Sequence, residues 1–398
     1  MSKAAVGRRL GRSRRWVTKW VGRWRSEGDD GLEDRSRVPQ IQPSKTPQRI
    51  VDKILATRAA LERIPEANIG GLSVLAALER DRFQPIPSLA TIERILSRSG
   101  VTRRHEPKRR TGVKLPLPTV TTPGVWQQAD WIHDRWLEGG IRFQALQVGD
   151  VGSHGIVSGQ YVDRKLITAV TFVVEKAWPV LSIPLAMGTN NAFTHTTHPN
   201  NPFTAWARVC LYFGIEVIIT PPGKHGWNNH IEAANNEWQR RTIRAQHFTN
   251  LDEVRSGSER ACWWMNHHRP VLNPAICGTR YPAEYITAHT DQLRWPPTIT
   301  IADYLDRHGT IHIPLAAGRI TYLRHVTKDH TITIAGTTWP TPTTIPTGGL
   351  VTATITTHDH TLTIRHQGQT VDTHPYPITH PVTDPYHPAA DHSLLNHV

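Results

Sequence analysis

The sequence predicts a multidomain chain with all-α units at the N-terminus, an α/β domain in the middle and an all-β region at the C-terminus. Three observations predict this order. Apolar residues recur at helical spacing up to about residue 100, β-branched runs alternate with helical runs over 125–246, and Thr/Ile alternation with a period of two follows Pro296. The 30 prolines and 28 glycines among 398 residues favour several small cores joined by linkers.

The chain carries a formal net charge of +13, and this charge is clustered. Residues 1–39 hold eleven Lys and Arg against five Asp and Glu, and residues 98–114 hold seven against one. Such clusters are typical of nucleic-acid binding, with a solvated surface as the alternative. There is no apolar run of membrane-spanning length and no CxxC spacing among the three cysteines, and we expect no signal peptide. We expect a cytoplasmic, nucleoid-associated protein with an anionic partner and no membrane contact.

Residues 1–39 are predicted to form a helix-turn-helix DNA-binding unit. A short helix over 3–10 ends at Gly11, and Ser13 is placed to cap a second helix. That helix has a stripe of Trp16, Trp20 and Trp24, which we interpret as core. Its basic side chains are expected to contact DNA: Arg14, Arg15, Lys19 and Arg23. Because a further helix normally closes such a core, we expect the unit to be truncated or to begin upstream of Met1.

Residues 46–112 are predicted to form a second helical, winged-helix-like DNA-binding unit. Helical spacing of apolar residues resumes after Pro47, and Ser88 is placed to cap a last helix that ends at Gly100. The basic segment that follows is expected to track the DNA backbone: Arg103, Arg104, Lys108, Arg109 and Arg110. A plain helical spacer is the alternative.

Residues 120–290 are predicted to form the α/β domain. The expected elements are strands at 125–132, 142–151 and 155–163, a helix at 167–178, a strand at 181–187, a helix at 202–213, a strand at 215–220 and a helix at 229–246. This βββαβαβα order is the one found in ribonuclease-H-like folds.

Residues 296–398 are predicted to form a small β-barrel-like module. The runs 331–334, 351–355 and 361–364 alternate Thr with apolar residues, and Gly, Pro and Asp separate them. Twelve of the 23 histidines lie in this region without regular ligand spacing. We interpret them as surface composition rather than a metal site.

Two acidic residues of the α/β domain are candidate site residues. Asp130 shares a strand face with Trp126 and Gln128, and a carboxylate in mid-strand either ends the strand or projects into a site at the sheet edge. Glu232 falls in the first turn of the last predicted helix, where an acidic residue also complements the helix dipole.

Three segments together resemble the integrase-type insertion-sequence transposases. They are "VWQQADWI" with Asp130, "GIEVIITPPGKHGWNNHIEAANNEWQ" with Glu232, and "MNHHRPVLNPAICGTRYPAEYI" with Asn266, Arg269, Pro270, Pro282 and Glu284. The resemblance implies a retroviral-integrase-like catalytic core, metal-dependent DNA cleavage and strand transfer, and a homo-oligomer on double-stranded DNA, namely the terminal repeats of a mobile element and its target.

The resemblance also implies a DDE carboxylate triad with two Mg²⁺ or Mn²⁺ ions, in which Asp130 bridges both metals and Glu232 holds one. The second Asp is missing. Anchoring "LAMGTNNAFTH" on Phe193 places Gly188 at that position, and Asn190 or Asn191 could supply a neutral carbonyl. Two functions therefore stay open: an active DNA transposase, or a catalytically inactive transposase remnant that only binds DNA.

Overall fold

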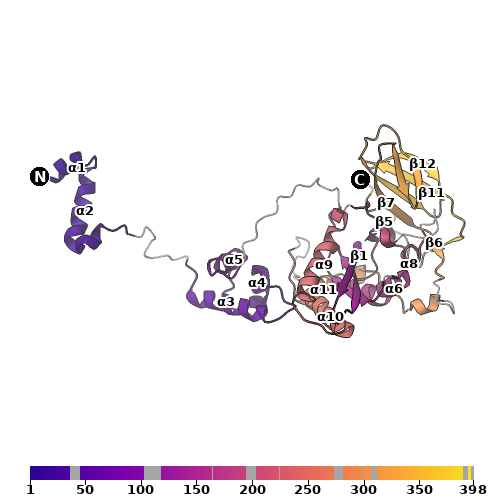
Figure 1. Cartoon of the computed structure of the whole chain (residues 1–398), viewed down its shortest axis with the longest axis horizontal. Helices are drawn as coiled ribbons and strands as arrows, with labels where there is room; N and C mark the ends of the chain where they lie inside the picture. Colours follow the sequence, from indigo (N-terminus) through magenta and orange to yellow (C-terminus); the bar gives the residue numbers. More distant parts are fainter. Residues whose placement is uncertain are drawn as a thin grey trace. The chain divides into compact units, whose positions relative to one another are not determined.

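The computed structural model describes residues 1–35, 45–102, 118–163, 165–193, 203–223, 225–272, 281–298, 300–305, 312–388 and 393–395 (Figure 1). The chain divides into two compact units, Met1–Val51 and Asp52–Val398. Within the described ranges, no helix has the length and apolar character needed to cross a membrane.

The first unit contains the predicted helix-turn-helix. Helix α1 spans Lys3–Arg9, helix α2 spans Arg14–Glu27, and a 3₁₀ turn η1 follows at Gly28–Leu32. As predicted, the Ser13 hydroxyl caps α2 by accepting from the backbone N–H of Trp16 at 3.1 Å. Gly11, with a φ of +61°, lets the chain turn between the helices.

The tryptophan stripe of α2 is not the closed core that the spacing indicated. Only Val17 of this helix is buried, whereas Trp16 is 40% and Trp24 is 52% exposed. The physical reason is the small number of elements in the unit: two short helices cover one side of the stripe, and the rest stays in solvent.

Three helices follow: α3 at Gln48–Glu62, α4 at Gly71–Arg80 and α5 at Leu89–Arg98. Their apolar faces are buried through Ile54, Val74, Leu78 and Ile92. The Ser88 hydroxyl caps α5 as predicted, accepting from the N–H of Thr91 at 3.3 Å. The basic segment from Arg103 to Arg110 lies outside the described residues.

The central sheet has the predicted strand order. Its strands are β1 Trp126–Trp136, β2 Arg142–Asp150, β3 Ile156–Tyr161, β4 Ala186–Thr189 and β5 Glu216–Ile219. The first three are antiparallel neighbours, and β4 and β5 add in parallel, which gives the spatial order β3-β2-β1-β4-β5. With the helices between them, this is the βββαβαβα order of a ribonuclease-H-like fold.

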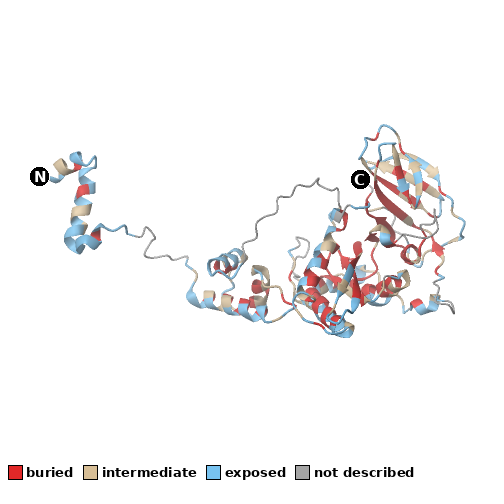
Figure 2. Cartoon of the chain, in the orientation of Figure 1, coloured by how far each residue is buried: buried red, intermediate tan, exposed pale blue. Residues whose placement is uncertain are grey.

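Helices pack on both faces of this sheet. The helices are α6 Leu166–Phe172, a π turn η2 at Val173–Ala177, α7 Trp178–Leu181, α8 Ala205–Tyr212, α9 Asn229–Arg241, α10 Leu251–His267 and α11 Pro282–Ala288. Helices α6 and α8 share a core with Ala129 and Leu146, and α9 and α10 share one with Ile132 and Phe143. Figure 2 shows burial concentrated in these strands and helices.

Some element bounds differ from the predicted ones. The strand expected at 181–187 begins only at Ala186, because the preceding helix continues to Leu181. Helix α9 ends at Arg241 instead of continuing to residue 246, since the chain turns at Thr242. Helices α10 and α11 were not predicted, although α10 covers the second face of the sheet.

The C-terminal region consists of β-strands, as predicted, and part of it continues the central sheet. They are β6 Leu315–Ala316, β7 Arg319–His325, β8 Thr331–Ile334, β9 Thr337–Pro340, β10 Leu350–Thr356, β11 Thr361–His366, β12 Gln369–Pro375 and β13 Val382–Thr383. Strand β7 pairs in parallel with β5, so one open sheet of nine strands runs from β12 to β3.

The junction of β5 and β7 joins the C-terminal strands to the central sheet. Without β7, the outer edge of β5 would leave unpaired backbone N–H and C=O groups. Glu216 on β5 is 4% exposed, and its carboxylate accepts hydrogen bonds from the hydroxyls of Thr321 on β7 and of Ser393. Buried polar contacts thus hold the C-terminal strands on the central sheet.

Candidate functional site

Asp130 lies near the middle of β1, beside the end of β4. The two parallel strands pair Trp126 with Ala186 and Gln128 with Gly188. Two residues further along the same register, Asn190 comes to lie next to Asp130. The side-chain amide of Asn190 donates a hydrogen bond to Oδ1 of Asp130 at 3.0 Å.

Helix α9 brings a second set of side chains to the same place. Gln128 fixes the start of this helix: its Oε1 accepts from the N–H of Ile231 at 3.1 Å, and its Nε2 donates to the carbonyl of Trp227 at 3.2 Å. One turn further on, the amide of Asn235 donates to Oδ2 of Asp130 at 3.0 Å. Glu232, three residues before Asn235, is therefore on the helix face that meets β1.

Asp130 and Glu232 line one pocket of about 110 Å³. The remaining lining residues come from the end of β4, the end of β5 and the start of α9: Asn190, Asn191, Thr220, Pro221, Pro222, Gly223 and Asn228. The structure thus brings the two predicted carboxylates together, although they are 102 residues apart in the chain.

Gly188, the residue that the sequence placed at the missing second Asp, is not part of this pocket. It is buried inside β4, and a Cβ at this position would lie 2.8 Å from Nε1 of Trp126 and 3.3 Å from Cγ of Gln128. A carboxylate there would face an indole in the interior. The parallel register of β1 and β4 instead brings position 190 beside Asp130, two residues after the position that anchoring on Phe193 gave.

The residue beside Asp130 is therefore Asn190, and its amide group has a defined orientation. Its Oδ1 accepts from the backbone N–H of Ala192 at 2.9 Å, while its Nδ2 donates to Asp130. Exchanging the amide oxygen and nitrogen would break both hydrogen bonds. Asn190 thus presents a donor, and not an oxygen ligand, to the pocket.

These donors do not fit a centre for two divalent cations. Mg²⁺ takes oxygen ligands, and each carboxylate of such a centre counts because few are used. Here Asp130 and Glu232 are the two carboxylates of the pocket lining, and Asn190 directs its amide NH₂, not its oxygen, to Asp130. In the described ranges, no group of three or more His, Cys, Asp and Glu side chains is placed to hold a metal ion.

A buried polar cluster under the start of α9 was not predicted from the sequence. The Asp150 carboxylate accepts from the N–H groups of Gly124 and Ser153 at 2.9 and 2.7 Å, and burial raises its pKa to about 6. The rings of His154 and His230 lie 4.9 Å apart. Burial, with the positive charge of Arg269 nearby, lowers the pKa of His154 to about 4 and that of His230 to about 3.

The basic side chains of α2 differ in whether they face solvent or pack against their own unit. Arg14, Arg15 and Lys19 are exposed and line one shallow hollow on the helix surface. Arg23 instead donates to the carbonyl of Glu33 at 2.6 Å, and its guanidinium lies 4.5 Å from the ring centre of Trp20. Three of the four predicted contact residues therefore face solvent, and the fourth packs against its own unit.

Comparison with known proteins adds two findings. A family model described as a homeodomain-like domain matches residues 16–96, from α2 through α5. No curated protein matches the chain.

Solved structures of viral integrases are similar to this chain at low sequence identity. A chain of the simian T-cell lymphotropic virus intasome, solved with a phosphatase regulatory subunit, is 12% identical, with 67% of this chain and 84% of that chain covered and a TM-score of 0.37. The HTLV-2 integrase catalytic core in complex with magnesium is 13% identical, covering 42% and 99%, with a TM-score of 0.30. The BIV integrase catalytic core is 14% identical, covering 42% and 98%, with a TM-score of 0.32.

The chain thus has homeodomain-like helices ahead of an α/β domain with the βββαβαβα order of ribonuclease-H-like folds. The homeodomain-like match covers residues 16–96, so membership of the integrase-type transposase family stays a prediction from the sequence motifs around Asp130, Glu232 and Asn266.

Proposed function

We propose that this protein binds the DNA of a mobile element as an integrase-type transposase does, and that it cleaves and joins DNA weakly or not at all until position 190 carries a carboxylate. One observation carries the proposal: the amide of Asn190 lies where a second carboxylate would stand beside Asp130, and it donates to Asp130 at 3.0 Å.

The electrostatics of the pocket support this proposal. A cluster of ionised carboxylates is stable only when cations compensate its charge. Here two neutral amides, Asn190 and Asn235, satisfy the oxygens of Asp130 by hydrogen bonds. With one carboxylate fewer, the pocket has less negative charge to attract a pair of divalent cations. Asp130 and Glu232 would be the only carboxylates of the pocket lining to hold such ions.

The charge distribution supports the DNA-binding half of the proposal. Arg14, Arg15 and Lys19 form an exposed basic surface on α2, and we propose that they contact the phosphates of the terminal repeats. The basic segment from Arg103 to Arg110 would track the backbone of the same DNA. Binding of paired element ends and target DNA by a homo-oligomer belongs to the same proposal and comes from the family resemblance.

A second candidate function is an active transposase that works with Asp130 and Glu232 alone and with Mg²⁺ or Mn²⁺. The shared pocket favours it, because the two carboxylates come from distant parts of the chain and still meet. The two candidates differ in whether the natural protein nicks DNA.

Nicking of supercoiled plasmid with Mn²⁺ separates them. We expect no nicking by the natural protein, nicking by Asn190→Asp, and none by the double variant Asn190→Asp with Asp130→Ala. Gly188→Asp is the matched control: it adds the same carboxylate two residues away, and we expect it to stay inactive. Nicking by the natural protein that is lost in Asp130→Ala would overturn the proposal in favour of the active enzyme.

A further inference from the structure

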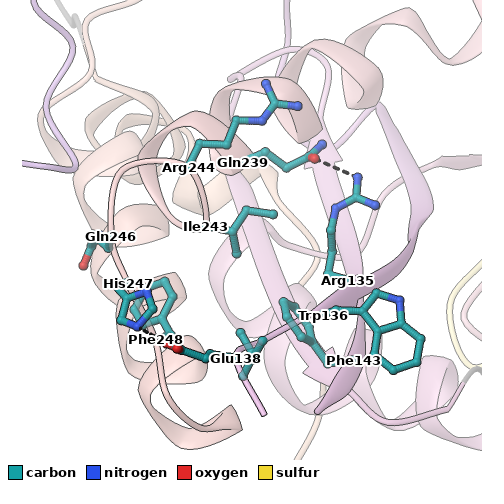
Figure 3. A pocket seen from close by; sticks show the side chains of 11 residues that line it. Arg135, Trp136, Glu138, Phe143, Gln239, Ile243, Arg244, Gln246, His247 and Phe248 are labelled. Carbon is teal, nitrogen blue, oxygen red and sulfur yellow. Dashed lines mark hydrogen bonds and ion pairs between the residues drawn. The ribbon is translucent and has the colours of Figure 1, made fainter. Parts of the chain in front are cut away.

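A second pocket, with a volume of about 340 Å³, is larger than the pocket of Asp130 and lies at the C-terminal end of β1 (Figure 3). The end of β1 and the turn after it form one side, with Arg135 and Trp136, and the segment that follows α9 forms the other, with His247 and Phe248. Its volume falls at the lower end of the range of about 300–1,000 Å³ for small-molecule sites. We name it the β1–α9 pocket.

The β1–α9 pocket combines an apolar floor with a polar, cationic rim. Phe143 is fully buried and Phe248 is 7% exposed, and both line it from within. Trp136 lies at its edge with 65% of its surface exposed. An indole this exposed contributes little to the core of the domain, but it offers a flat surface on which a ring can stack.

Arg135 supplies a positive charge that no carboxylate compensates among the described residues. Its guanidinium donates to Oε1 of Gln239 at 2.8 Å and to the backbone carbonyls of His133 and Asp134. All three acceptors are uncharged, so these bonds orient the guanidinium and leave its charge available. Arg244, also exposed, lines the same pocket.

Two carboxylates lie near these arginines. Glu237 of α9 forms ion pairs with Arg240 at 2.7 Å and Arg241 at 2.9 Å, and Glu138 lies 2.9 Å from His247, which forms an ion pair with it only when the histidine is protonated. Arg135 and Arg244 against Glu138 leave the pocket lining with a net positive charge, which suits an anionic group.

The β1–α9 pocket continues the site of Asp130 along the same two elements. Asn235 of α9 contacts Asp130 of β1, and Gln239, one turn later, contacts Arg135. Asp130 and Arg135 are five positions apart on β1, which has a register shift between Ile132 and Arg135, so at 3.3 Å per residue they lie at most about 16 Å apart. At 3.4 Å per base step, this is the length of about five steps of a DNA strand.

We infer that the β1–α9 pocket holds an unpaired nucleotide of a DNA strand that also crosses the Asp130 site. Its base stacks on Trp136 above the apolar floor, and its phosphate contacts Arg135 and Arg244. Exposed aromatic side chains beside cationic ones are the usual way in which proteins hold unpaired bases without reading their sequence. The inference rests on the proposed DNA binding and adds the form of DNA preferred: a duplex with a single-stranded end.

Binding of two DNA probes to the full chain tests this inference. The probes are a blunt duplex and the same duplex with an unpaired end of about five nucleotides, followed by fluorescence anisotropy. We expect the natural protein to bind the second probe about tenfold more tightly, and Trp136→Ala to remove that preference while blunt-duplex binding stays within about twofold. Trp136→Phe should retain part of the preference, because a phenyl ring still stacks.

Trp263→Ala is the matched control, since Trp263 is 53% exposed on α10 and does not line the pocket. It should keep the full preference. Arg244→Ala should lower the salt slope of the unpaired-end probe by about one. Equal binding of both probes by the natural protein, or equal loss of preference in both tryptophan variants, would overturn the inference and leave the proposed DNA binding intact. Failure to bind either probe would overturn both.

Discussion

The N-terminal helices and the central domain use the same residue type in opposite ways. Helix α2 carries Trp16 and Trp24 largely in solvent, whereas Trp206 of α8 and Trp238 of α9 are fully buried. All four lie on helices at positions that fit an apolar stripe. The difference teaches that periodicity identifies which face of a helix is apolar, and the number of packed layers decides whether that face is buried.

The largest expected effect is the loss of stability when a fully buried tryptophan is removed. Trp206 is 0% exposed, with its ring centre 4.5 Å from that of Phe193. Trp206→Ala should lower the free energy of unfolding by about 3–5 kcal/mol, because it leaves a cavity. Trp24→Ala should cost less than about 1 kcal/mol, mainly its hydrogen bond to Asp29.

Denaturant unfolding followed by circular dichroism measures both changes. If Trp206→Ala does not fold, Trp206→Phe gives a smaller loss with the same sign. Equal losses at positions 206 and 24 would contradict the comparison, since they would mean that the exposed stripe is as well packed as the core.

An intermediate effect is expected from acid. Low pH should lower the stability of the central domain but not that of the first unit, because the described residues 1–35 contain no histidine. Unfolded histidine takes up a proton near pH 6.5, but folded His154 and His230 do so only near pH 4 and 3. Between these values the unfolded state binds more protons, so stability is present above pH 6.5 and is lost as the pH falls.

The loss should reach about 1.4 kcal/mol per pH unit for each histidine. Asp150 acts in the opposite direction: its pKa is raised to about 6, so its protonation below that value restores part of the stability. Thermal unfolding at pH 7 and pH 5 measures the net change, and His230→Gln should make the core less sensitive to acid. An acid response unchanged by this substitution would contradict the assignment to the histidine pair.

The smallest expected effect is a change in the salt dependence of DNA binding, which compares an exposed arginine of α2 with a packed one. Arg15 is exposed, whereas Arg23 packs on Trp20 and donates to the carbonyl of Glu33. Arg15→Ala should lower the slope of log affinity against log salt by about 0.9, as expected for one lost phosphate contact. Arg23→Ala should leave that slope unchanged and reduce the stability of the helix pair. Equal slope changes in the two variants would show that Arg23 also reaches DNA.

Much of the fold could be predicted from the sequence because its signals are local. The Ser13 and Ser88 caps, the strand runs and the βββαβαβα order depend on neighbours within a few residues. Helix α10 was missed because its buried stripe consists largely of small or polar residues, such as Gly257, Ser258 and Ala261, so that its apolar periodicity is weak in the sequence. Asp130 and Glu232 were identified by the resemblance of their segments, and the pocket that joins them follows from how β1 and α9 pack.

The sequence by itself determined the order of the helical, α/β and β regions and the basic character of residues 1–39 and 98–114. It also identified Asp130 and Glu232 as the candidate carboxylates. Only the tertiary structure decided three other features: Asn190 and not Gly188 stands beside Asp130, β7 continues the sheet of β5, and Trp136 borders a pocket with Arg135. The physical reason is the same for each. Strand register and edge pairing join residues that are distant in the chain, and a shift of one or two residues changes which side chain meets the site.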